Sequence, residues 1–357
     1  MACFIFSFLI RKSFSRKMIN TTMTWSDQER DALATALKRY AFATEGINDV
    51  GVHSSLGEAC IRRCAGQSGY DLSSLELLYT GRRDHYVVIK NILDCSAIPP
   101  TPTDDRVPPT SGWHHVISCI LGTLTVAGTR PGSFLHEKEG RLCHMVAPAK
   151  VNEEALHRTT KTLHYHTEIV NGALPGERLV GGGRPVSPDV IALACLRNPN
   201  DVGTTLLPVE RILDNLPFSV IEQLLLPNFS ASSQSSFDVV TTIANVPVLV
   251  PLEGGKMAIR YSRSKLVGNT PQARSALQLL TDFLDRDEFG TTVSLQPGDI
   301  LLMNNRTCLH RRVAIKNTAQ FDGTDRWLIR IYGFGHEIWQ TAKRSAEQHH
   351  VIIFGDQ

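Results

Sequence analysis

The feature that most constrains the fold is a succession of short, β-prone segments that fills the chain from about residue 130 onward. Turn residues separate these segments at fairly regular intervals, as in β-sandwiches and barrels. The predicted strands are 142–147, 163–169, 190–196, 204–207, 239–243, 247–252, 257–261, 300–303 and 327–334. We therefore expect a mainly β fold, a sandwich or barrel with helices flanking it.

Helix signals occur both before this β region and within it. Ser26 followed by Glu29 forms a capping box, which marks a helix start. Thr270, followed by proline and an apolar periodic run, marks another. A further helix is predicted over 113–121, with Gly122 as its end.

No internal repeat and no long linker divides the chain. We therefore interpret residues 26–345 as one domain, with a helical part over 26–80 and a β core over about 81–340.

Residues 1–25 are set apart from this domain. The apolar run at the start is far shorter than the roughly 20 residues of a membrane span. Its basic residues follow the apolar run, whereas a secretory signal places them first. Two interpretations stay open: a mitochondrial-type leader, or a start placed too early, since Met18 or Met23 could each begin the chain.

Charge and cysteine usage exclude several classes of protein. The 37 Lys+Arg nearly balance the 35 Asp+Glu, and no long run of like charges occurs, so neither a nucleic-acid nor a membrane partner is expected. The 8 cysteines are too dilute for a disulfide scaffold. Reduced thiols favour a cytoplasmic protein, unless the mitochondrial leader applies.

Candidate metal ligands lie in the triplet His166-Thr167-Glu168 of a predicted strand. Residues i and i+2 of a strand point to the same side, so His166 and Glu168 can bind one ion. With a distant histidine they would form the 2-His-1-carboxylate face of non-haem Fe(II) oxygenases. Because the chain has 13 histidines, about one such triplet is expected by chance, and a surface glutamate beside an ordinary strand histidine is the alternative.

His310 supplies a distant histidine. It follows a turn, an apolar strand and a polar segment, and enough predicted strands separate it from His166 to cross a barrel and return. Beyond it, Arg326 and Arg330 share one side of a predicted strand. A buried arginine there would match a dicarboxylate cosubstrate through a bidentate pair, whereas a surface salt bridge is the alternative for each.

Six segments in a fixed order carry a family resemblance. They are PPTPT at 99–103, EGRL at 139–142, LHYHTE at 163–168, PDVIALACLR at 188–197, GDILLMNNR at 298–306 with His310 after it, and DRWLIR at 325–330. Over roughly residues 80–335 the chain resembles the clavaminate synthase-like branch of Fe(II)/2-oxoglutarate oxygenases, which includes arginine and asparagine β-hydroxylases.

The resemblance implies a distorted double-stranded β-helix, or jelly-roll, core. It assigns Fe(II) ligation to His166, Glu168 and His310. His164 points the same way as His166 and competes as a ligand, but His166 keeps the His-x-Glu pattern.

The resemblance also implies residues that bind small molecules. Arg326 would bind 2-oxoglutarate, assisted by a threonine of the Gly-Thr-Thr-Leu stretch, for which Thr205 is preferred. Arg330, four residues after Arg326, would meet the carboxylate of the amino-acid substrate. Glu137, three residues before the Gly-Arg-Leu motif, would meet its amino group.

One departure from the family bears on the substrate. Arginine hydroxylases offer acidic groups near residue 262, whereas this chain has no acid over 260–265. Ser262 and Ser264 could hydrogen-bond a neutral or acidic side chain, and Arg263 could pair with a carboxylate. The alternative is that Arg263 is a solvated charge at a sheet edge.

The sequence therefore predicts a hydroxylase that uses Fe(II), 2-oxoglutarate and O2. Its expected substrate is a free polar or acidic L-amino acid, such as glutamate or asparagine, oxidised at C3 in secondary metabolism. A β-sandwich binding module without iron is one alternative. A zinc hydrolase is another, because Zn²⁺ also accepts two histidines and a glutamate with one position open. The ordered Arg326 motif disfavours both, and oligomeric state stays open.

Overall fold

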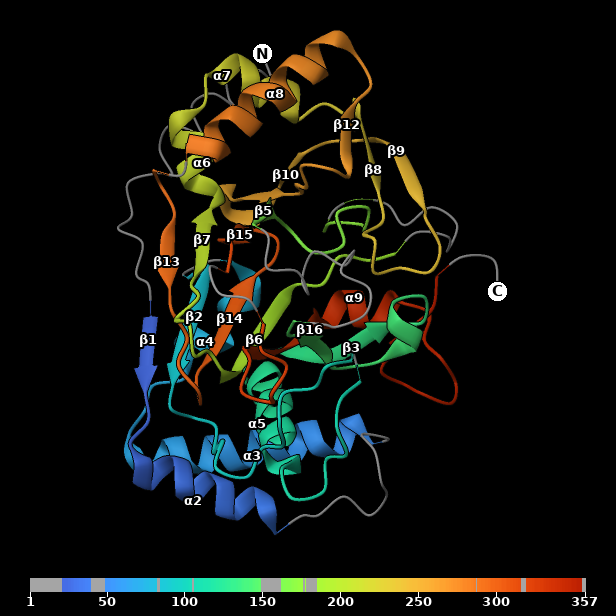
Figure 1. Cartoon of the computed structure of the whole chain (residues 1–357). Helices are drawn as coiled ribbons and strands as arrows, with labels where there is room; N and C mark the ends of the chain where they lie inside the picture. The colour runs from blue at the N-terminus through green and yellow to red at the C-terminus, as the bar shows by residue number, and fades with distance from the viewer. Residues whose placement is uncertain are drawn as a thin grey trace.

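The computed structural model describes residues 21–39, 49–81, 84–104, 106–148, 162–175, 177, 185–286, 288–315 and 319–354. Within these residues the chain forms a mixed α/β structure with several sheets, the largest of eight strands (Figure 1). The predicted mainly β fold with flanking helices is thus confirmed in part, since helices contribute whole layers.

The eight-stranded sheet spans the centre of the molecule. Its order is β1-β2-β14-β6-β16-β3-β17, with β4 paired to β16. The strands are β1 (Thr21–Thr24), β2 (Tyr86–Lys90), β3 (Thr129–Phe134), β4 (His144–Val146), β6 (Val190–Arg197), β14 (Ile300–Asn304), β16 (Trp327–Gly335) and β17 (Val351–Ile352).

A four-stranded sheet, in the order β13-β7-β15-β5, lies against one face of the large sheet. Its strands are β5 (Leu163–His166), β7 (Thr204–Pro208), β13 (Thr291–Val293) and β15 (Cys308–Arg312). Two smaller sheets follow, made of β8 (Phe229–Ser232), β9 (Thr242–Val246) and β12 (Leu266–Gly268), and of β10 (Leu249–Pro251) and β11 (Met257–Ile259).

Helices cover the two ends of this arrangement (Figure 1). The helices α2 (Asp27–Lys38), α3 (Val50–Ser68) and α5 (His114–Val126) form a layer against the far face of the large sheet. The helices α6 (Val209–Asn215), α7 (Phe218–Leu224) and α8 (Pro271–Arg286) pack over the smaller sheets. The described residues also form shorter elements: α4 (Ser73–Glu76), α9 (His336–Thr341), and the 3-10 turns Leu78–Thr80, Lys138–Gly140 and Glu253–Gly255.

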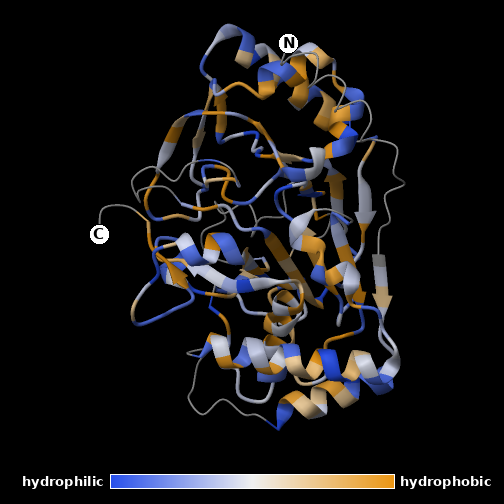
Figure 2. Ribbon diagram, turned by 180° about the vertical axis from the view of Figure 1, so that it is seen from behind, coloured by the Kyte–Doolittle hydropathy of each residue, from blue (hydrophilic) through white to orange (hydrophobic). Residues whose placement is uncertain are grey.

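The residues of strand β6 show how the large sheet packs against a hydrophobic core on each of its two faces. Its residues alternate between faces. Val190, Ala192 and Ala194 pack toward the helices, while Ile191 and Leu193 pack toward the four-stranded sheet. A strand buried on both faces is apolar along its buried length, as this one is from Val190 to Leu196 (Figure 2). The space between the two sheets therefore lies in the interior, where the candidate site is found.

The capping-box helix is confirmed. The Ser26 side chain accepts from the backbone N–H of Glu29, and the Glu29 side chain accepts from the N–H of Ser26, at the start of α2. The helix predicted to end at Gly122 is wrong in its end, because α5 continues to Val126. Gly122 instead allows a close helix crossing, since a Cβ there would lie 2.3 Å from the Gly57 backbone of α3.

The folded part begins before residue 26. Strand β1 pairs in parallel with β2, and Trp25 is buried. Residues 21–24 therefore belong to the large sheet, and the N–H of Trp25 donates to the carbonyl of Lys90 just beyond it, although the sequence analysis set residues 1–25 apart. The rest of the proposed leader, residues 1–20, lies outside the described residues. Among the residues that the structure describes, no helix is long and apolar enough to cross a membrane.

Candidate active site

Two histidines from neighbouring strands face one another. His166 ends β5, and His310 lies in the middle of β15, where the antiparallel register pairs the two residues directly. Their ring centroids are 4.1 Å apart. The sequence placed His310 at the end of a polar segment, but it lies in a strand paired on both sides, which buries it.

The carboxylate of Glu168 completes this group. Its Oε1 lies 3.8 Å from Nε2 of His166 and 3.7 Å from Nε2 of His310. The predicted strand ran to residue 169, whereas β5 ends at His166 and Glu168 follows it. Within the described part of the chain, these three are the only His, Cys, Asp or Glu set whose ligand atoms all lie within 4.8 Å of one another.

The imidazoles present lone pairs to this space. Nδ1 of His166 donates to the backbone carbonyl of His164 at 2.8 Å, so the neutral form of this ring has its lone pair on Nε2. Burial, followed by the proximity of His166, lowers the pKa of His310 to about 4. Two imidazoles and one carboxylate are donors suited to a divalent transition metal, so the residues fit the predicted ion. His164 lies outside this set, with Nδ1 at 3.3 Å from Nη1 of Arg263.

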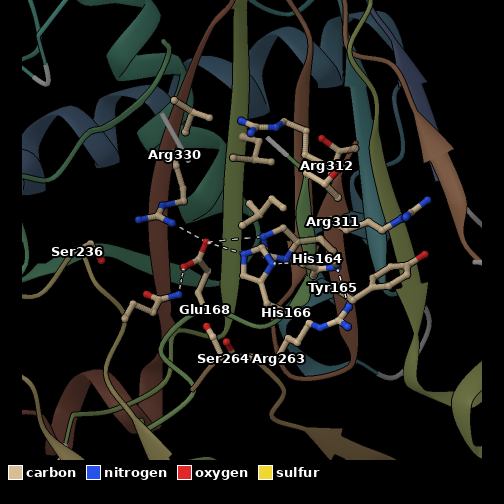
Figure 3. Close-up of a pocket in the computed structure, with 18 of the residues that line it drawn as sticks. His164, Tyr165, His166, Glu168, Ser236, Arg263, Ser264, Arg311, Arg312 and Arg330 are labelled. Carbon is tan, nitrogen blue, oxygen red and sulfur yellow. Dashed lines mark hydrogen bonds and ion pairs between the residues drawn. The ribbon is translucent and has the colours of Figure 1, made fainter. Parts of the chain in front are cut away.

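The Glu168 carboxylate is held on both oxygens. Nη1 of Arg330 donates to Oε1 at 2.6 Å, and Nε2 of Gln234 donates to Oε2 at 2.7 Å. Burial alone would raise the pKa of Glu168, but the Arg330 guanidinium and the two imidazoles outweigh it and hold that pKa well below its ordinary value. The carboxylate is therefore ionised and oriented (Figure 3).

Arg330 links this carboxylate to a second buried acid, Glu137. Nη2 of Arg330 lies 3.2 Å from Oε1 of Glu137 and 2.7 Å from Nδ1 of His144. The hydroxyls of Ser236 and Tyr332 also donate to Oε1 of Glu137, at 2.7 and 3.2 Å. Burial raises the pKa of Glu137, although Arg330 opposes the shift. The structure thus brings both predicted substrate residues, Arg330 and Glu137, to the edge of the three-residue group.

His166, Glu168, His310 and Arg330 line a cavity of about 490 Å³, whereas Glu137 is fully buried and contacts Arg330 without lining it. Figure 3 shows Arg312 at one end of the cavity. Thr204 pairs with Arg312 across β7 and β15, and the Arg312 charge acts on Arg326, so these three lining residues form that end. Both arginines are buried. Burial lowers the pKa of Arg312 to about 10; burial and the neighbouring Arg312 charge lower the pKa of Arg326 to about 10. Both stay cationic near neutrality, so this end of the cavity attracts an anion.

The structure does not bring Thr205 to this cavity. Its hydroxyl hydrogen-bonds that of Thr292 on β13 at 2.9 Å. Alternation along β7 turns the preceding residue, Thr204, toward the cavity instead. The preference for Thr205 over Thr204 is therefore corrected. Neighbouring residues of a strand point to opposite faces, so a difference of one position decides which threonine faces the cavity.

Ser262, Arg263 and Ser264 line the opposite end of the cavity, as Figure 3 shows for the latter two. Arg263 is half-exposed, and its Nη1 lies 2.8 Å from Oδ1 of Asp285, so it has a counter-charge of the chain's own. Six of the described lining residues are lysine or arginine, and Glu168 is the single acid among them. The cavity as a whole therefore favours anionic ligands.

Several contacts were missed by the sequence analysis. Arg312 was recognisable in principle, because it stands two residues after His310 in one strand. Gln234, Tyr332 and His144 had no local signal. They approach the site only because the segment after β8, the end of β16 and strand β4 converge there.

The first comparison is with a model of a protein family. The model described as "Taurine catabolism dioxygenase TauD, TfdA family" matches residues 152–332. That stretch contains the three clustered residues and both Arg326 and Arg330.

Curated relatives match a larger part of the chain. An L-asparagine oxygenase of Streptomyces coelicolor is 29% identical over 256 residues, which is 70% of this chain and 71% of that protein. Clavaminate synthase 2 of Streptomyces clavuligerus is 27% identical over 263 residues, covering 71% of this chain and 74% of the relative.

A solved structure resembles the fold. Asparagine oxygenase in complex with Fe(II), 2S,3S-3-hydroxyasparagine and succinate superposes with a TM-score of 0.75, covering 94% of this chain and 99% of that one at 23% identity.

Proposed function

This chain belongs to the taurine catabolism dioxygenase TauD, TfdA family, and we propose that it hydroxylates a free polar or acidic L-α-amino acid at C3. As a member of that family it is a 2-oxoglutarate-dependent oxygenase that uses Fe(II). One observation carries the proposal: a single cavity joins a two-histidine, one-carboxylate cluster to buried cations and to Arg330, which in turn pairs with the fully buried Glu137.

His166, Glu168 and His310 are the proposed metal ligands. Bound there, Fe(II) with O2 and 2-oxoglutarate supplies the oxidising power, while the cosubstrate is converted to succinate and CO2. The chain's own contribution is orientation. His164 sets the tautomer of His166, and Arg330 and Gln234 fix the Glu168 carboxylate.

The cationic end of the cavity is the proposed site for 2-oxoglutarate. Arg326 would hold the distal carboxylate through two parallel hydrogen bonds, which its planar guanidinium favours. Arg312 adds a second buried cation beside it, and the Thr204 hydroxyl replaces the predicted Thr205. Both arginines also exclude water from the distal carboxylate, because they are buried.

Arg330 and Glu137 are proposed to bind the backbone of the amino acid. A zwitterion carries one carboxylate and one ammonium group, and this pair offers the two complementary charges within 3.2 Å of each other. Because Arg330 also contacts Glu168, a carboxylate held by Arg330 lies beside the metal ligands, which brings the α- and β-carbons close to the reacting centre.

The proposed side-chain subsite is the opposite end of the cavity. Ser262 and Ser264 supply hydroxyls, while Arg263 and Lys265 supply positive charge. A guanidinium or ammonium side chain would find no described carboxylate there other than Asp285, which Arg263 already holds. We therefore favour glutamate or asparagine, and the relative named L-asparagine oxygenase supports a polar, uncharged or acidic side chain.

The fold interpretation follows the same family. We propose that the eight-stranded and four-stranded sheets are the two halves of a distorted jelly roll within one domain over residues 26–345, extended by β1. The site would then lie between its halves, where His166 and His310 are found.

The test is succinate formation from 2-oxoglutarate by the Fe(II)-loaded protein with a panel of free L-amino acids. Glutamate or asparagine should support turnover at least about tenfold above arginine and lysine, a difference of roughly 1.4 kcal/mol. Replacing Arg263 by glutamate should narrow or reverse that ranking. A wild-type protein that prefers arginine or lysine would contradict the substrate class while leaving the oxygenase assignment intact.

A further inference from the structure

The backbone of Glu168 lies outside any strand. Strand β5 ends at His166, so the amide N–H and carbonyl of Glu168 have no strand neighbour to pair with. Both belong to a residue that is 2% exposed. A buried backbone polar group needs a partner, and the partner that it finds sets where the attached side chain points.

That partner is the side chain of Asn305. Its Oδ1 accepts from the Glu168 N–H at 2.8 Å, and its Nδ2 donates to the Glu168 carbonyl at 3.1 Å. One carboxamide thus satisfies both groups of one residue, as an adjacent strand would. The same Nδ2 also lies 3.0 Å from the carbonyl of Pro188 and 3.2 Å from Oγ of Ser187.

Asn305 lies where it can connect the position of Glu168 to that of His310. Fully buried, it occupies the turn between β14 and β15, five residues before His310. Its own N–H donates to the carbonyl of Asp189 at 2.9 Å, which ties the turn to the start of β6. Asn305 therefore connects the carboxylate-bearing segment to the strand that carries His310.

The segment after Glu168 needs such support. Ile169 has φ of 54°, in the left-handed region that a β-branched side chain rarely adopts. Strained backbone of this kind persists only where surrounding contacts over-determine it. Buried Arg260 supplies a second support, because its Nη1 donates to the carbonyls of Val170 and Gly172 at 3.2 and 3.1 Å.

We propose that Asn305 is a positioning residue that holds the Glu168 carboxylate in register with His166 and His310, and so preorganises the metal site. It touches neither the proposed ion nor the substrate, and acts through the Glu168 backbone. The inference rests on the metal ligands named above, but not on the substrate class. Loss of an outer-shell partner typically costs 10–100-fold in metal affinity.

The adjacent residue offers a matched control. Asn304 is equally buried, and its Nδ2 donates to the carbonyls of Leu78 and Tyr79 at 2.8 and 3.2 Å. Its Oδ1 accepts from the N–H groups of Arg306 and Thr307. Asn304→Ala therefore removes a similar number of buried hydrogen bonds at the end of β14, next to the same turn, without touching Glu168.

The experiment is anaerobic titration of Fe(II) into the full chain without substrate, for the wild type, Asn305→Ala and Asn304→Ala. Thermal unfolding of the metal-free proteins is measured beside it. We expect Asn305→Ala to weaken Fe(II) binding roughly 10- to 100-fold and to shift the charge-transfer absorption of the Fe(II)–2-oxoglutarate complex. Asn304→Ala should change stability alone.

Equal Fe(II) affinity in wild type and Asn305→Ala, or equal losses in both variants, would overturn the inference. If Asn305→Ala does not fold, Asn305→Asp replaces it, since it keeps the side-chain size and the acceptor for the Glu168 N–H while removing the donor. That variant should also bind Fe(II) more weakly, and wild-type affinity in it would refute the role. No Fe(II) binding by the wild type would overturn the ligand assignment itself.

Discussion

At the residue scale, two buried carboxyl groups in one hydrogen-bond network have pKa values that are shifted in opposite directions. The pKa of Glu168 is held below its ordinary value, while burial raises the pKa of Glu137. Both contact Arg330, but Glu168 also faces two imidazoles. One guanidinium, that of Arg330, contacts both carboxyl groups, so an additional cation at the imidazoles would further stabilise the buried charge of Glu168. This is the electrostatic reason to place the divalent metal there.

The ligand assignment predicts that alanine substitutions of His166 and His164 affect Fe(II) binding very differently. His166→Ala should abolish high-affinity Fe(II) binding and turnover together, because it removes one of three ligands. His164→Ala should keep Fe(II) binding, since the backbone carbonyl that orients His166 remains. Calorimetric Fe(II) titration under nitrogen checks both variants. Unchanged affinity in His166→Ala would refute the assignment.

The cosubstrate assignment predicts a change in KM. Arg326→Lys replaces a planar fork by a point charge, so it should raise the KM for 2-oxoglutarate roughly 10- to 100-fold, a loss of about 1.4–2.7 kcal/mol. Arg263→Lys, at the other end of the cavity, should leave that KM near the wild-type value. Steady-state succinate assays at varied 2-oxoglutarate measure both, and equal effects in the two variants would argue against the assignment.

Burial of His310 predicts a pH dependence of stability. Its folded pKa of about 4 lies below the ordinary value of 6.5. Between those values the unfolded chain takes up a proton that the folded chain refuses, so stability falls as pH falls from about 6.5 toward 4. His310→Gln should flatten this slope in the metal-free protein by up to about 1.4 kcal/mol per pH unit. Denaturant unfolding across that range measures it, and parallel slopes would contradict the burial argument.

At the scale of elements, long periodic segments were predictable and short paired ones were not. The helices α2 and α8 begin at recognisable caps, and β6 and β14 are apolar runs. In contrast, β8, β12, β13 and β17 have two to four residues each and exist because neighbouring strands pair with them. Local sequence cannot specify such pairing, which depends on segments far away in the chain.

The crossing of α3 and α5 predicts two opposite effects of alanine within one helix. A Cβ on Gly57 would lie 2.1 Å from the carbonyl oxygen of Ser118, so Gly57→Ala should destabilise the protein by about 1–3 kcal/mol. Gly66 is in the same helix with nothing within 4 Å, so Gly66→Ala should stabilise it by about 0.5–1 kcal/mol. Chemical denaturation compares them. Similar effects of the two substitutions would contradict the close-crossing account.

At the scale of the whole molecule, residues far apart in sequence converge on one cavity between two sheets. The motif residues His166, Glu168, His310 and Arg326 were recognisable from their types and order. The sequence could not show that Thr204 rather than Thr205 lines the cavity, because this depends on which face of β7 meets the cavity. The roles of Gln234 and Asn305 were also hidden, because they arise from tertiary contacts with Glu168.

The positive charge of the cavity lining also comes from segments that are far apart in the sequence. Lysine and arginine side chains from β15, β16 and the segment after β11 surround one ionised carboxylate. A cavity of one sign concentrates ligands of the opposite sign. This favours 2-oxoglutarate, a dianion, and an acidic amino acid over a cationic one.

Turnover under ¹⁸O2 with the Fe(II)-loaded protein, 2-oxoglutarate and the amino acid that supports the fastest succinate release would show whether this protein is an amino-acid hydroxylase. We expect one labelled oxygen atom in succinate and one in a hydroxylated amino acid, formed in equal amounts. A zinc hydrolase would take its oxygen from water and act without O2, and a binding module would form no succinate. Label in neither product, or an amino acid returned unchanged with every substrate tried, would contradict the assignment as an amino-acid hydroxylase.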